Sequence, residues 1–178
     1  DDQIWGVSGF NQIWGGYGRD TIQGGDSRDA IYGGGSEANV LFGNDGSDTI
    51  WGGGGADQIA GGAGGDTVLG GEGNDSLYGG LDNDLIGGGS GNDEIWDGAG
   101  NNQIWGGLGN DSVYGGAGND AIDGNEGNDS LDGGEGDDML TGGANNDTLE
   151  GGAGDDVIYG GDGDDVMTGS DGNDQIYA

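Results

Sequence analysis

The chain of 178 residues contains no cysteine, no histidine, no proline and no lysine. Without cysteine there is no disulfide and no thiol nucleophile, and without histidine there is no Ser-His-Asp triad and no zinc or haem site of the usual kind. The absence of proline excludes collagen, although glycine supplies 52 residues. No apolar run approaches the roughly 20 residues that a membrane-spanning helix requires. These absences therefore exclude the metal, redox and nucleophilic enzyme chemistries named above.

Positive charge is also nearly absent, because two arginines face 35 acidic residues and leave a formal net charge of −33. Such a surface repels nucleic acid and anionic lipid and attracts cations, so we expect no nucleic-acid partner and no membrane span. The start carries neither an initiator methionine nor a basic-then-apolar signal, and we expect a segment of something longer or processed. High charge with 30% hydrophobic residues is also typical of disordered chains.

What the sequence does contain is a nine-residue period that runs from end to end. Gly115 to Asp123 is one clear copy of the pattern G-G-x-G-x-D-x-U-x, in which U is aliphatic. Nineteen copies begin at residues 6, 15, 24, 33 and 43 and then every nine residues to 169, with one extra residue between Gly33 and Phe42. The eighth position is apolar in every copy, and the sixth is Asp except at Asn11, Asn39 and Asn102. A disordered polar chain has no reason to keep this phase, so the period predicts a folded chain in the presence of the right ligand.

The period predicts an all-β fold. One apolar residue in nine gives no helical stripe, whereas three residues such as Ser112-Val113-Tyr114 suit a short strand with the middle side chain inward. The six residues before each strand are rich in Gly, Asn and Asp, which favour tight turns. Two short strands and two turns make one coil of 18 residues, and about ten such coils stack as a parallel β-roll, or β-solenoid, over residues 1–178.

The sixth-position carboxylates predict a metal site. In a roll the turn of one copy lies over the turn two copies later, so Asp111 stacks near Asp129 and Asp120 near Asp138. Like charges at this spacing destabilise the stack unless they are neutralised. Carboxylate oxygens together with carbonyls made accessible by glycine form a hard oxygen site that suits Ca²⁺ better than Mg²⁺. Because a thin core and many glycines leave the metal-free chain unstable, we expect folding to depend on calcium.

The predicted ligands form a large set that shares one position in the repeat. Ten turns on one edge and nine on the other leave nine and eight gaps, or at most about 17 calcium sites. The predicted carboxylate ligands are Asp20, Asp29, Asp48, Asp57, Asp66, Asp75, Asp84, Asp93, Asp111, Asp120, Asp129, Asp138, Asp147, Asp156, Asp165 and Asp174. The accompanying backbone carbonyls include those of Gly107, Gly109, Gly116, Gly118, Gly134, Gly136, Gly152, Gly154, Gly161 and Gly163.

The nonamer resembles the repeats-in-toxin (RTX) β-roll of calcium-binding bacterial exoproteins, and the likeness covers residues 2–177. The resemblance implies a right-handed roll whose G-G-x-G-x-D turns bind Ca²⁺ between copies n and n+2. It also implies secretion by a type I system, with folding on meeting extracellular calcium. Family members carry enzyme, pore-forming or adhesin domains elsewhere in the chain, and none is recognisable here.

Departures from the pattern predict uneven calcium occupancy. The copies in residues 1–45 are degenerate, since Asn11 replaces Asp, Arg28 enters one turn and the extra residue enters another. The copies in residues 106–178 are the most regular, so we expect calcium to fill the C-terminal half first. Copy 9 has Asp82 in place of a glycine, and copy 11 has Asn102 in place of Asp.

Aromatic residues gather at the ninth position, where side chains should face outward on both sheets. They are Trp5, Trp14, Tyr32, Phe42, Trp51, Tyr78, Trp96, Trp105 and Tyr114, followed later by Tyr159 and Tyr177. One interpretation is cross-strand ladders that stabilise the sheets. The other is an interaction face, on which lateral packing replaces calcium where the turns are degenerate.

Two classes of function remain. The first is a non-catalytic calcium-binding structural module of a secreted or cell-surface protein, because no pair of carboxylates is singled out for acid–base chemistry. The second is a filament, surface-layer or adhesin subunit that self-associates end to end, since open roll ends expose strand edges. Ice or sugar binding is a weaker alternative, because no regular threonine array is present. The irregular first four copies favour natural drift over a designed repeat.

Overall fold

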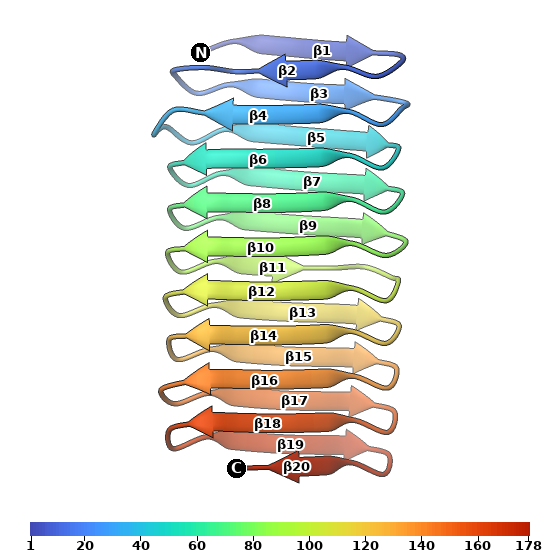
Figure 1. The fold of residues 1–178 in the computed structure, drawn as a ribbon, viewed down its shortest axis with the longest axis vertical. Coiled ribbons are helices and arrows are strands. Elements are labelled where there is room, and N and C mark those ends of the chain that lie inside the picture. The colour runs from blue at the N-terminus through green and yellow to red at the C-terminus, as the bar shows by residue number, and fades with distance from the viewer.

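The computed structural model describes residues 1–178, which form twenty β-strands and no helix. The strands alternate between two parallel sheets, so the chain winds as a flattened coil whose turns stack along one axis from the N-terminus to the C-terminus (Figure 1). The first sheet contains β1 (Gln3–Val7), β3 (Thr21–Gly25), β5 (Val40–Asp45), β7 (Gln58–Ala63), β9 (Ser76–Leu81), β11 (Glu94–Trp96), β13 (Ser112–Ala117), β15 (Ser130–Glu135), β17 (Thr148–Ala153) and β19 (Val166–Asp171). The second contains β2 (Gln12–Trp14), β4 (Ala30–Gly34), β6 (Thr49–Gly54), β8 (Thr67–Glu72), β10 (Leu85–Ser90), β12 (Gln103–Leu108), β14 (Ala121–Glu126), β16 (Met139–Ala144), β18 (Val157–Asp162) and β20 (Gln175–Tyr177). No helix is available to cross a membrane.

The pairing register confirms the predicted coil. Val113 of β13 pairs with Leu131 of β15, and Ile122 of β14 pairs with Leu140 of β16, each 18 residues further on. Each sheet holds ten strands in the order of the coils. The fold is therefore the expected parallel β-solenoid of about ten coils.

The strands are longer than the three residues that the sequence pattern predicts. Most run for six, because the paired glycines and the residue after them continue the parallel ladder. Gly116 pairs with Gly134 and Ala117 with Glu135, although Gly116 has a φ of 99°. Glycine adopts this conformation without steric cost, so segments expected as turns extend the sheets.

The core is a single file of eighth-position side chains between the two sheets. Seventeen of them, from Ile13 to Ile158, form one buried cluster, and Ile4 and Met167 pack against it partly buried. Ile176, in β20 at the edge of the second sheet, is 46% exposed. Residues on either side of the eighth position face outward, as the alternating burial of β13 shows.

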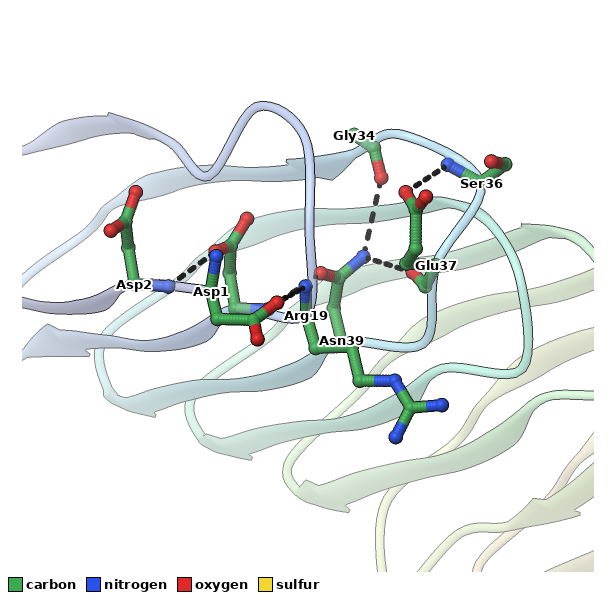
Figure 2. A network of polar contacts seen from close by, with 8 residues as sticks. Asp1, Asp2, Arg19, Gly34, Ser36, Glu37 and Asn39 are labelled. Carbon is green, nitrogen blue, oxygen red and sulfur yellow. Dashed lines mark hydrogen bonds and ion pairs between the residues drawn. The ribbon is translucent and has the colours of Figure 1, made fainter.

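The extra residue of the fourth copy is absorbed by its turn. Gly34 still pairs with Gly53, and Val40 still pairs with Gln58, so both sheets keep register across the insertion. In this turn the backbone N–H of Ser36 donates to Glu37 Oε2 at 3.2 Å (Figure 2). The break in phase therefore leaves both sheets in register, although the β4–β6 ladder is one pair shorter than the β6–β8 ladder.

Candidate metal centre

The sixth-position residues stack in two columns, one along each edge of the roll. The backbone N–H of Asp111 donates to Asp129 Oδ1 at 2.8 Å, and that of Asp120 donates to Asp138 Oδ1 at 2.8 Å. The same bond joins every neighbouring pair along both edges. One column is Asp2, Asp20, Asn39, Asp57, Asp75, Asp93, Asp111, Asp129, Asp147 and Asp165. The other is Asn11, Asp29, Asp48, Asp66, Asp84, Asn102, Asp120, Asp138, Asp156 and Asp174.

The second oxygen of these carboxylates is buried without a partner. This holds for fourteen of the sixteen predicted ligands, namely Asp20, Asp29, Asp48, Asp57, Asp66, Asp75, Asp84, Asp93, Asp111, Asp120, Asp129, Asp138, Asp147 and Asp156. Asp165 and Asp174 lie half-buried in the last two turns, and their Oδ1 atoms accept the N–H groups of Asp147 and Asp156. A buried charged oxygen without a hydrogen bond is costly, so these atoms require a proton or a cation.

Burial also raises the pKa values of several aspartates in the columns. Desolvation raises the pKa of Asp66, Asp75 and Asp138 to about 7, from 3.8 for a free aspartate, although a backbone hydrogen bond to each carboxylate opposes the rise. It raises the pKa of Asp48 and Asp129 to about 6. Neighbouring carboxylates add to the effect in all five. Ionised carboxylates in the columns are therefore unfavourable unless a cation binds beside them.

Backbone carbonyls lie beside the carboxylates in the turns. The fourth-position carbonyls of Gly109, Gly118, Gly136, Gly154 and Gly163 accept no backbone hydrogen bond and no side-chain hydrogen bond. The predicted second-position carbonyls, those of Gly107, Gly116, Gly134, Gly152 and Gly161, lie instead within paired strand segments. An equivalent carbonyl, that of Gly98, accepts the N–H of Ala117 at 3.1 Å. The fourth-position carbonyls are thus the freer of the two predicted sets.

The first glycine of the repeat makes room for the column. A Cβ added at Gly115 would lie 2.7 Å from Asp120 Oδ2 and 2.7 Å from the carbonyl oxygen of Gly133. Real Cβ atoms do not approach other atoms so closely, so any side chain here would displace buried carboxylate or backbone. The absence of a side chain keeps both oxygens in one small space.

The donor set is composed of oxygen alone. No three acidic side chains converge on one point anywhere in the chain. An ion would therefore be held by two stacked carboxylates and by turn carbonyls, which is a hard oxygen set. Ca²⁺ accepts six to eight such ligands in flexible geometry, so the residues present fit calcium.

Two of the three asparagine turns are closed differently. Asn39 Nδ2 donates to the carbonyl oxygens of Gly34 at 3.2 Å and Glu37 at 3.1 Å (Figure 2). Asn11 Nδ2 likewise donates to the carbonyl oxygen of Gly9 at 2.7 Å. In these two turns the side-chain amide of asparagine donates the hydrogen bonds that the turn carbonyls accept. This supports the expectation that the N-terminal turns bind calcium poorly.

A second ladder runs along the fifth position and was not predicted. The N–H of Asn110 donates to Asn92 Oδ1 at 2.8 Å, and that of Asn119 donates to Asn101 Oδ1 at 2.8 Å. These bonds run without a break from Asn74 to Asn173, and one isolated bond of the same kind joins the N–H of Arg19 to Asp1 Oδ1 at 2.7 Å. The signal in the sequence is the run of Asn and Asp at this position from Asn74 onward, where earlier copies carry other residues. The ladder adds regularity to the C-terminal part of the roll.

One further residue was missed. Asp97 is the only first-position residue among the nineteen copies that is not glycine. It is 5% exposed, and its Oδ2 is buried without a partner.

The ninth-position aromatics face outward in one broken column on each sheet. Trp14 stacks on Tyr32 with ring centroids 5.6 Å apart, and Tyr78 stacks on Trp96 at 5.1 Å. Trp5 and Trp14 are 56% and 61% exposed. The stacked pairs support the ladder interpretation. The aromatic face, meaning Trp5, Trp14, Tyr32, Phe42, Trp51, Tyr78, Trp96, Trp105 and Tyr114, remains partly open to solvent.

Fold and turns together define a parallel β-solenoid with two columns of carboxylates along its edges. The family model of the RTX calcium-binding nonapeptide repeat matches residues 5–36, 33–68, 61–95, 87–122, 114–149 and 141–176. The chain belongs to this family, and it is a calcium-binding β-roll of that kind.

Among solved structures, the chain is similar to a hyperactive, Ca²⁺-dependent, β-helical antifreeze protein from an Antarctic bacterium, with 22% sequence identity and a TM-score of 0.40. The similarity covers 99% of this chain and 83% of that chain. No curated protein sequence matches the chain.

Proposed function

We propose that the chain is a non-catalytic structural module of a secreted or cell-surface protein and that it folds when calcium binds. The observation that carries this proposal is the set of fourteen buried, unpartnered Oδ2 atoms that repeat at each turn. The sixteen predicted aspartates, with the fourth-position carbonyls, are the proposed ligands.

The proposed coupling of folding to calcium follows from electrostatics. The folded roll brings carboxylates together at one-strand spacing within a chain of net charge −33, whereas the unfolded chain leaves each carboxylate in water. Bound calcium would supply the positive charge that these stacked oxygens lack. Because the paired carboxylates exist only in the folded chain, binding energy becomes folding energy.

A non-catalytic role is supported by the uniformity of the columns. An acid–base enzyme requires two carboxylates whose environments differ, so that one donates and the other accepts a proton. Asp111, Asp129 and Asp138 instead repeat one environment, with one oxygen bonded to a backbone N–H and the other buried. Repetition of this kind suits the binding of metal ions at many equivalent sites along the roll.

Counting bound ions tests the proposal. Asp129 borders two gaps of its column, so we expect Asp129→Asn to lose one or two calcium ions per chain in equilibrium dialysis. Asp132→Asn removes the same charge from the outer face of β15 and should leave the number unchanged. An Asp129→Asn chain that binds as many ions as the unaltered chain would contradict the assignment.

A second function, self-association, is favoured by the aromatic face. Its Trp5 and Trp14 side chains are 56% and 61% exposed, and contiguous exposed aromatic area is typical of a surface that binds a partner. A second copy of the chain could pack against this face. Electron microscopy with and without calcium separates the two functions, because fibres that need calcium support assembly and uniform short rods support the single module. Lateral association through the aromatic face would appear in ultracentrifugation as concentration-dependent dimers.

A further inference from the structure

The turn between β11 and β12 departs twice from the repeat, and the two departures lie in one copy. Asp97 stands where every other copy has glycine, and Asn102 stands where most copies have aspartate. One carboxylate is therefore removed and another is added within six residues. At Asn11 and Asn39, by contrast, the first position of the copy remains glycine, at Gly6 and Gly33.

The Asp97 side chain occupies the place of a backbone carbonyl. In regular turns a Cβ on the first-position glycine would meet the first-position carbonyl oxygen of the copy two further on, as Gly115 would meet that of Gly133. At Gly79 the atom in this place is Oδ1 of Asp97. The N–H of Gly80 donates to the same Oδ1 at 2.9 Å. The carbonyl oxygen of Asp97 lies on the other side, 3.0 Å from a Cβ added at Gly116.

The Asp97 carboxylate therefore lies close to that of Asp84, which belongs to the copy two earlier in the chain. A Cβ at Gly79 would lie 2.7 Å from Asp84 Oδ2, so both carboxylates border the same small space. Asp84 is 4% exposed and Asp97 is 5% exposed, and the Oδ2 atom of each has no hydrogen-bond partner. Two buried carboxylates in one space repel each other strongly unless a proton or a cation lies between them.

Asn102 behaves unlike the asparagines of the degenerate turns. Its Oδ1 accepts the N–H of Asp84 at 2.8 Å and so keeps the column intact. Its Nδ2 is buried without a partner, whereas the Nδ2 atoms of Asn11 and Asn39 donate to turn carbonyls. The Asn102 amide therefore makes no hydrogen bond to a turn carbonyl, unlike the amides of Asn11 and Asn39.

We propose that Asp97 is a calcium ligand that replaces the carboxylate lost at Asn102, so that the gap between copies 9 and 11 holds an ion through Asp84 and Asp97. This inference rests on the proposed function of the columns and assigns a residue that the repeat pattern leaves out. The gap that looks defective from the sixth position of copy 11 alone therefore retains two carboxylates, one from each copy.

Substitutions in the full chain separate ligation from a structural role. Asp97→Gly restores the glycine of the other copies and removes one of the two carboxylates that border this gap. In saturating calcium the same variant should bind one ion fewer by native mass spectrometry. The double variant Asp97→Gly with Asn102→Asp rebuilds the regular turn and should regain that ion. Glu94→Gln, which removes one charge from the exposed outer face of β11, should leave the number unchanged.

The outcomes distinguish this inference from the proposed function. If Asp97→Gly binds as many ions as the unaltered chain while Asp129→Asn loses at least one, the columns bind calcium and Asp97 is not a ligand. If neither variant changes the number of ions, the assignment of the columns themselves is overturned. If Asp97→Gly loses an ion that Asn102→Asp does not restore, the carboxylate acts on the structure of the turn and the inference fails.

Discussion

Each turn assigns different tasks to the two oxygens of one carboxylate. Oδ1 of Asp129 accepts the N–H of Asp111 at 2.8 Å and holds two coils in register. Oδ2 of the same side chain is buried and remains available for a cation. Asparagine can perform the first task and not the second. Oδ1 of Asn39 accepts the N–H of Asp20, and Oδ1 of Asn102 accepts the N–H of Asp84, so both residues leave the columns unbroken while changing what they can bind.

Backbone conformation at the second and fourth positions is the other constraint on single residues. Most of these positions are glycine with positive φ, and most of the other residues there keep it, with φ of 82° at Val7 and 73° at Asn125. A β-branched residue in this region is strained by roughly 1–3 kcal/mol. Asparagine tolerates the same region at lower cost.

We therefore expect Val7→Gly to stabilise the roll by about 1 kcal/mol, because relief of strain exceeds the backbone entropy of the added glycine. Val7 is 71% exposed, so little packing is lost with its side chain. Chemical denaturation in calcium measures the change. Asn125→Gly is the matched control and should gain less, and a larger gain for Asn125→Gly would contradict the assignment of strain.

Much of this residue-scale picture could be predicted from the sequence. Periodicity places Asp111 over Asp129 and Val113 in the core, because a strict nine-residue repeat with two strands per coil allows one register. Asp97 could not be placed from the pattern, since the position of its carboxylate depends on which way its own peptide carbonyl points. The sequence also could not show which glycine carbonyls accept hydrogen bonds in the strand ladder and which remain free in the turns, because strand pairing decides this.

At the scale of strands and turns, the two halves of the roll are held by different contacts. From Asn74 to Asn173 the fifth-position ladder runs beside the carboxylate columns, whereas the first copies lack it. In the N-terminal part, stacked aromatics such as Trp14 and Tyr32 join neighbouring strands, and Asn39 closes its turn with its amide. The sequence indicated these halves through turn regularity, and it did not indicate that the paired glycines would lengthen the strands.

This difference predicts an order of calcium binding along the chain. As calcium is added to the metal-free chain, amides in residues 106–178 should become protected from hydrogen exchange at lower calcium than amides in residues 1–45. The regular turns offer two carboxylates at every gap, while the first turns offer fewer. Protection that appears first in residues 1–45, or at one calcium concentration throughout, would contradict the predicted order.

At the scale of the whole molecule, the columns make stability depend on pH with opposite signs in the two metal states. Burial raises the pKa of Asp66, Asp75 and Asp138 to about 7 in the folded metal-free chain, from 3.8 when free. The folded chain therefore binds more protons than the unfolded chain between these values, and stability falls as pH rises through about 7. Protons and calcium compete for the same oxygens, so acid weakens the calcium-bound form.

We expect the far-ultraviolet β signal in calcium-free buffer to be larger at pH 5 than at pH 8. In calcium the number of bound ions should fall over the same range as the pH is lowered. Both series stay above the isoelectric point, near pH 4.1, to avoid precipitation. A calcium-free β signal that rises with pH would contradict the raised pKa values of the buried aspartates.

We propose that calcium binding to the carboxylate columns drives folding of the roll. Far-ultraviolet circular dichroism of the full chain, recorded before chelation, after chelation at neutral pH and after calcium is restored, measures this coupling. We predict that the β signal is lost on chelation and returns with calcium, while magnesium at the same concentration restores much less of it. A β signal that persists unchanged after chelation would mean that the roll folds without calcium.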